Sequence, residues 1–180
     1  MKKYHVILAA TAAAVAATPA SAEVAGVRLE ALVGYDAIDT GIAGFDDESG
    51  AAYGLGVGYD LPVSEQVSLG LDAEVTESSV GEEVGPFDID AARDIYVGGR
   101  ATFALNESFN LYVKGGYTNQ RVKVEAFGTS DSTNFDGFRA GLGAQYNLGG
   151  FYIGGEYRYS NYEDDLSRNQ VMALVGVRFD

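Results

Sequence analysis

The stretch Asn169–Phe179, NQVMALVGVRF, alternates strictly between two chemically different faces. One face is wholly apolar and ends in an aromatic side chain: Val171, Ala173, Val175, Val177 and Phe179. Period-two alternation predicts a β-strand, and a tilted strand of this length crosses a bilayer. Because unpaired backbone N–H and C=O groups are costly in lipid, the strand needs a neighbour on each edge. The second neighbour of a last strand is the first strand, so the chain should close into a barrel.

Seven earlier segments share this alternation and predict seven more strands. They are residues 27–35, 52–61, 67–76, 94–103, 111–118, 138–146 and 151–159. The connectors alternate between long, polar stretches and tight turns. The long stretches are 36–50, 77–93, 119–136 and 162–168, and the tight turns lie around 62–65, 105–108 and 147–150. Long loops at one end and short turns at the other predict an all-β, eight-stranded antiparallel up-and-down transmembrane β-barrel.

Alternation alone does not decide which face points inward, because a soluble lipocalin-like barrel holds its apolar face inside. The polar face carries eleven glycines, which suit a crowded lumen better than a solvated exterior. They are Gly34, Gly54, Gly56, Gly58, Gly70, Gly98, Gly116, Gly141, Gly143, Gly154 and Gly176. Aromatic residues of the apolar face gather near strand ends, as in the interfacial girdles of membrane barrels. Both features favour a membrane barrel with its polar face inward.

The first 22 residues have the pattern of a secretory signal peptide. Lys2 and Lys3 precede an apolar centre of about twelve residues, which is too short for a spanning helix. Small residues at Ala20–Ala22 provide the cleavage site. We therefore expect a cleaved signal at 1–22 and one barrel domain at 23–180.

Composition excludes several classes of function. Without the signal, the chain keeps ten basic and 26 acidic residues, a charge that disfavours a nucleic-acid partner. There is no cysteine, and the only histidine, His5, lies in the signal. A histidine-based catalytic or metal site therefore cannot form in the mature chain, and we expect a non-enzymatic protein without a cofactor.

Two acidic runs could in principle bind Ca²⁺ or Mg²⁺. They are Asp46-Asp47-Glu48 and Glu163-Asp164-Asp165. Neither has the spacing of an EF-hand, and a hard-cation site needs about six oxygen ligands in fixed geometry. Solvated acidic loops are the favoured interpretation, so no metal site is predicted.

The inward faces of the predicted strands carry balanced charge, with six bases and six acids. These are Arg28, Arg100, Lys114, Arg139, Arg158 and Arg178, and Glu30, Asp60, Asp72, Glu74, Asp94 and Glu156. The long connectors hold sixteen acids and four bases. An ion-selective pore favours a ring of one sign. The balance instead predicts a lumen closed by paired ions, with the excess negative charge in the loops.

Several segments resemble Gram-negative outer-membrane proteins of the opacity-protein and OmpA-like, porin-family class of eight-stranded barrels. Besides the signal, they are 93–100 (RDIYVGGR), 111–117 (LYVKGGY), 156–160 (EYRYS) and 176–179 (GVRF). The resemblance implies an outer-membrane location, contact with outer-membrane lipids and lipopolysaccharide, and biogenesis through periplasmic chaperones and the barrel-assembly machinery. It also implies that Phe179 acts as the assembly signal, weakened here by the additional Asp180.

Three functions remain open on the sequence. The first is a structural or surface-interaction protein with acidic extracellular loops. The alternative is a small porin-like channel for ions or small solutes, and the third is a soluble, secreted ligand-binding barrel. The loop chemistry does not select an extracellular ligand.

Overall fold

A computed structural model of the chain describes residues 24–39, 48–84, 87–126, 129–163 and 166–179. The predicted signal at 1–22 therefore lies outside the described residues. Among the described residues, no helix is long and apolar enough to cross a membrane.

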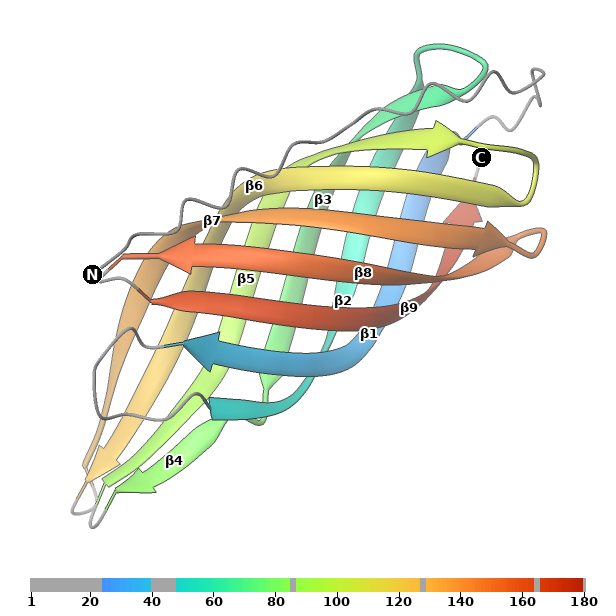
Figure 1. Cartoon of the computed structure of the whole chain (residues 1–180). Helices are drawn as coiled ribbons and strands as arrows, with labels where there is room; N and C mark the ends of the chain where they lie inside the picture. The colour runs from blue at the N-terminus through green and yellow to red at the C-terminus, as the bar shows by residue number, and fades with distance from the viewer. Residues whose placement is uncertain (1–23, 40–47, 85–86, 127–128, 164–165, 180) are drawn as a thin grey trace, which may run out of the picture.

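The described residues form nine antiparallel strands. Their bounds are β1 Gly26–Asp39, β2 Glu48–Pro62, β3 Val67–Ser78, β4 Gly81–Val84, β5 Phe87–Ala104, β6 Phe109–Ala126, β7 Thr129–Asn147, β8 Phe151–Tyr162 and β9 Ser167–Phe179. β1 pairs with both β2 and β9, and β3 pairs with β5, which closes a barrel of eight strands (Figure 1). The pairing of β1 with β9 runs from Val27 opposite Phe179 to Asp39 opposite Ser167. The predicted fold, including closure of the last strand on the first, is confirmed.

Two connectors predicted as long loops are largely strands, and that part of the prediction is wrong. Residues 119–126 of β6 pair without interruption with 129–136 of β7, and β5 begins at Phe87. The short β4 pairs with the start of β5. Together these strands extend past the ends of β1, β8 and β9 as a projecting sheet (Figure 1). Short alternations continue in the extension, at 87–91 (FDIDA) and 121–126 (RVKVEA), but 129–134 (TSDSTN) carries no apolar residue, because outside the bilayer neither face needs to be apolar.

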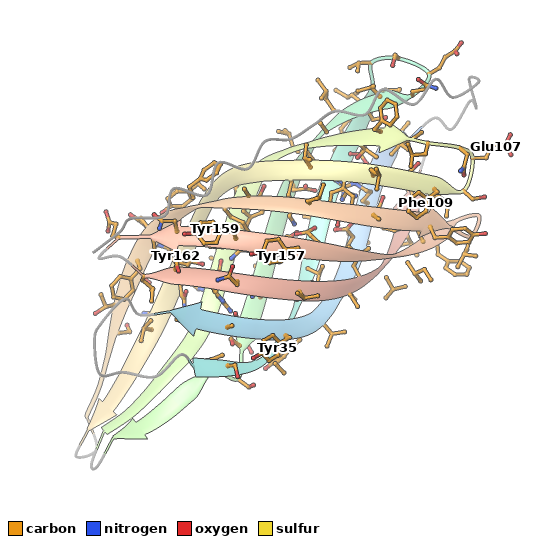
Figure 2. The ribbon with its side chains drawn as sticks, viewed as in Figure 1. Tyr35, Glu107, Phe109, Tyr157, Tyr159 and Tyr162 are labelled. Atoms are coloured by element: carbon orange, nitrogen blue, oxygen red, sulfur yellow. The ribbon has the colours of Figure 1, made fainter. Side chains whose placement is uncertain are left out.

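Side-chain exposure confirms which face points outward. On the apolar face, Leu55 is 69% and Leu71 is 72% exposed, whereas Arg139 and Arg158 on the polar face are 0% exposed. Aromatic side chains such as those of Tyr35, Tyr157 and Tyr159 lie on the outer surface (Figure 2). A soluble barrel would bury these apolar side chains. The soluble ligand-binding alternative is therefore inconsistent with the structure.

Lumen glycines make space for tyrosine rings. Tyr112 on β6 is aligned with Gly143 on β7, and Tyr152 on β8 is aligned with Gly176 on β9. A Cβ atom added to either glycine would overlap the ring of its partner. A large inward side chain therefore fits, because the aligned residue of the neighbouring strand is a glycine and has no side chain.

The outward orientation of β9 predicts the effect of charge at Val175. This residue is 50% exposed near the middle of the strand. Replacement Val175→Arg should reduce the free energy of unfolding in lipid vesicles by about 2–4 kcal/mol, because it places a charge in the hydrocarbon layer. Chemical denaturation measures this loss, with Val175→Leu as the neutral control. Equal tolerance of arginine and leucine would contradict the membrane-facing assignment.

Candidate functional site in the lumen

The strands direct the predicted charges into the barrel. Eleven of the twelve residues predicted for the lumen are buried, and Arg178 is partly buried. Their ion pairs form three groups along the barrel, described below from the short-turn end to the long-loop end.

At the short-turn end, Arg28 on β1 binds three carboxylates. Its Nε donates to Asp60 at 2.6 Å, its Nη2 to Asp72 at 2.6 Å and its Nη1 to Glu30 at 3.1 Å. Glu30 also accepts from Nη1 of Arg100 at 3.1 Å. Glu30 is on β1 and Arg100 on β5, three strands away around the wall, so this contact crosses the interior. The remaining base at this end, Arg178, lies 3.9 Å from Asp60.

The middle group contains two bases and two carboxylates, and each base is paired with both carboxylates. Lys114 is paired with Glu74 and, at 2.8 Å, with Glu156. Arg158 is 2.9 Å from Glu74 and 2.5 Å from Glu156. Glu74 is on β3 and Arg158 on β8, four strands apart in either direction around the barrel. Their ion pair therefore spans the full width of the lumen.

At the long-loop end, four donors converge on the carboxylate of Asp94. They are Arg139 at 2.5 Å, Arg168 at 2.9 Å, the Tyr162 hydroxyl at 2.6 Å and the Thr118 hydroxyl at 2.6 Å. Arg168 also binds Asp36 on the neighbouring β1 through two of its nitrogens. Arg168 belongs to β9 and Asp94 to β5, on opposite walls. A second ion pair thus crosses the whole width of the barrel.

Asp36 and Arg168 were not among the predicted lumen residues, because both were assigned to long connectors. They are 0% and 1% exposed. The sequence held a usable signal, since Asp36 keeps the parity of Arg28 and Glu30 along β1. Extending the alternation by one residue pair would have placed Asp36 inside the barrel. The pair adds one acid and one base and leaves the charge balance unchanged.

Apolar residues lie beyond the Asp36–Arg168 ion pair. Ile38 and Val80 are 8% and 5% exposed and contact Leu166. Ile38 follows Asp36 by two positions and Leu166 precedes Arg168 by two, so both continue the inward face toward the loops. This apolar cluster joins the end of β1 with the β3–β4 and β8–β9 connections.

The chemistry of the lumen is that of compensated charge. Among the described residues, no group of three or more histidine, cysteine or acidic side chains is arranged to hold a metal ion. The two acidic runs, 46–48 and 163–165, lie largely outside the described residues.

On the projecting sheet, hydrogen bonds donated by Tyr117 and Asn119 hold the pKa of Asp136 below its ordinary value.

Structural comparison finds eight-stranded outer-membrane proteins. The attachment invasion locus protein Ail of Yersinia pestis is 22% identical, with a TM-score of 0.64 over 86% of this chain and 99% of that chain. A structure of Ail with the heparin analogue sucrose octasulfate also matches, with 23% identity, a TM-score of 0.61 and coverage of 86% and 99%. Neisserial surface protein A is 15% identical, with a TM-score of 0.64 and coverage of 86% and 97%. These identities establish similarity of fold.

A search of curated proteins found no match. The sequence model of the outer membrane protein beta-barrel domain matches residues 6–179, almost the whole chain. The match agrees with the closed barrel, its apolar exterior and its charged interior. The chain belongs to the outer membrane protein beta-barrel domain family and is a protein of the Gram-negative outer membrane.

Proposed function

We propose that the protein is a non-enzymatic structural and surface-interaction protein whose lumen is closed by its own side chains. The observation that supports this most directly is the set of ion pairs that cross the barrel. Arg158–Glu74 and Arg168–Asp94 join opposite walls at two different levels. An eight-stranded barrel has room for side chains and little else. Paired long side chains that meet across it leave no continuous path for water.

The charge pattern also favours closure over conduction. Both signs occur in each of the three groups, and each base has a carboxylate partner. A selective pore is usually lined by a ring of one sign. An ion that entered this lumen would have to displace an existing pair and meet a charge of its own sign.

The second candidate is a small porin-like channel, and one observation favours it. Within the described part of the chain, the side-chain amides of Asn110 and Gln170 make no hydrogen bond, although they are 0% and 1% exposed. Buried amides of this kind usually bind water. A chain of water molecules along them would be the beginning of a conducting path.

The interaction surface in this proposal comprises the projecting sheet and the loops, which we assign to the extracellular side. The long connectors hold sixteen acids against four bases, and two of these residues, Asp36 and Arg168, are turned into the lumen. Such a surface repels polyanions, so a sulfated ligand like the heparin analogue bound by Ail would be disfavoured here. A cationic or neutral partner fits the charge.

The remaining partners follow from the location. The apolar exterior is suited to outer-membrane lipids, and lipopolysaccharide would surround the extracellular girdle. We propose that Phe179, whose side chain is 55% exposed at the end of β9, is presented to the barrel-assembly machinery after delivery by periplasmic chaperones.

Planar-bilayer recording separates the two candidates. The unmodified protein should give little or no steady conductance, because cross-barrel ion pairs fill the lumen. Heat-modifiable migration in gels verifies that the barrel in the same preparation is folded. Large, steady single-channel currents would contradict the closed lumen and support the porin-like alternative.

Removing one member of the middle group should show that the stability of the barrel depends on these ion pairs. Glu156→Ala leaves Lys114 and Arg158 short of a partner and should cost about 3–5 kcal/mol in the free energy of unfolding. A second change, Lys114→Ala or Arg158→Ala, should restore part of this loss. Chemical denaturation measures the unmodified protein, the single variants at Glu156, Lys114 and Arg158 and the two double variants, with Glu107→Ala in an exposed turn as the control (Figure 2). Additive losses in the double variants would show that the residues are not coupled.

Proteolysis of intact cells tests the orientation. Added protease should cut between Asp36 and Gly50, a long polar connector rich in small residues. It should cut more slowly within 119–126 or 129–136, because these residues are paired in β6 and β7. Cuts confined to the turns near Pro62 or Asn106 would mean that the short turns, and not the loops, face outward.

A further inference from the structure

The residue two positions before β1 is buried. Val24 is 3% exposed, whereas Val27, the first outward residue of β1, is 40% exposed. The carbonyl of Val24 accepts a hydrogen bond of 2.6 Å from the hydroxyl of Ser68. Ser68 is itself 3% exposed and lies on the inward face near the start of β3. The backbone at Val24 is therefore held at the inner side of the barrel wall, at its short-turn end.

Gly26 gives the chain the turn needed to reach this position. Its φ of 92° lies in the left-handed region, which side-chain-bearing residues rarely adopt. Gly26 is also the residue aligned with Asp60, the last lumen carboxylate of β2. The carbonyl of Val24, two residues earlier, reaches the inward-facing hydroxyl of Ser68.

Three polar lumen residues near this mouth are shielded from solvent, whereas Arg178 at the same end is partly exposed. Asp60, Ser68 and Asn110 are 1%, 3% and 0% exposed, although each lies within a few residues of a short turn. Polar side chains at an open barrel end would be hydrated. Thr102, aligned with Ser68, is 2% exposed and its hydroxyl makes no hydrogen bond within the described part of the chain. A segment that covers the mouth accounts for this burial, and Val24 is in position to do so.

We infer that Val24–Gly26, the N-terminal strap, is a lid that closes the periplasmic mouth of the lumen. Ser68 holds it through the Val24 carbonyl, and Gly26 is its hinge. The strap goes beyond the proposed ion-pair closure, because it seals one end of the barrel without contributing to those pairs. It also makes the two ends different, since the long-loop end is covered by the apolar cluster of Ile38, Val80 and Leu166.

Single cysteines can report on the strap because the chain has none of its own. Ala104→Cys is the reporter at the periplasmic mouth, where Ala104 is 2% exposed and aligned with Asn110. Ala52→Cys is the matched reporter toward the other end, where Ala52 is 0% exposed and aligned with Ser78. Each is combined with Val24→Asp, which places a carboxylate at a buried position, or with the milder Ser68→Ala. The folded, detergent-solubilised barrel is treated with a bulky, charged thiol reagent.

The strap predicts a specific pattern of labelling rates. Val24→Asp should accelerate labelling of Ala104→Cys by at least about tenfold, because a buried unpaired carboxylate drives the strap out. Ser68→Ala should accelerate it by about fivefold, the factor equivalent to one ordinary hydrogen bond. Val63→Asp, in the exposed turn after β2, should leave the rate unchanged, and the Ala52→Cys rate should not respond to any of these changes.

Three results would overturn the inference. In a barrel whose strap is unmodified, Ala104→Cys could react as fast as Val63→Cys in the exposed turn, which would show an open mouth. Its rate could be insensitive to both Val24→Asp and Ser68→Ala. Ala52→Cys could accelerate together with Ala104→Cys, which would indicate general loosening of the barrel. Conductance of the same variants separates this inference from the proposed function, because a released strap leaves the cross-barrel ion pairs in place and the lumen non-conducting.

Discussion

The requirement that every backbone N–H and C=O group be paired within the bilayer is the constraint on which this structure depends. It is met by the antiparallel pairing of β1 with β9, which joins the two ends of the folded chain and leaves the barrel wall without an open edge. Closure of eight strands fixes the width of the barrel and separates an inner from an outer face on every strand. The outer face then has to be apolar, and the inner face receives the polar residues.

Closure also creates an electrostatic problem, because six predicted bases and six predicted acids share a narrow interior. Desolvation of a charge is offset only when a partner lies close by. The structure meets this condition with ion pairs that run along neighbouring strands and across the barrel. Glycine supports the arrangement, since Gly143 and Gly176 leave space for the rings of Tyr112 and Tyr152. The hydroxyls of these tyrosines in turn bind Glu156 and Glu30.

The ends of the barrel are less constrained than its wall. Outside the bilayer, β5, β6 and β7 continue as a sheet that no longer needs an apolar face. At one end an apolar cluster lies beyond the Asp36–Arg168 pair, and at the other the carbonyl of the buried Val24 is bound by Ser68. The wall explains the membrane location, whereas the ends carry the proposed interaction surface and the proposed strap.

The sequence alone determined the spanning strands, which face of each strand points outward, and the identity of most lumen charges. The physical reason is that lipid outside and charge inside impose a strict period of two, which is visible without coordinates. Where that demand ends, the prediction is wrong: residues 119–136 are strands, although only 121–126 alternate and their partner 129–134 has no apolar residue that would mark it as a strand. Only the tertiary structure decided which charges pair, because partners such as Arg168 and Asp94 are 74 residues apart and meet only after the barrel closes. It also decided the position of Val24, which depends on a single left-handed glycine and a hydroxyl from β3.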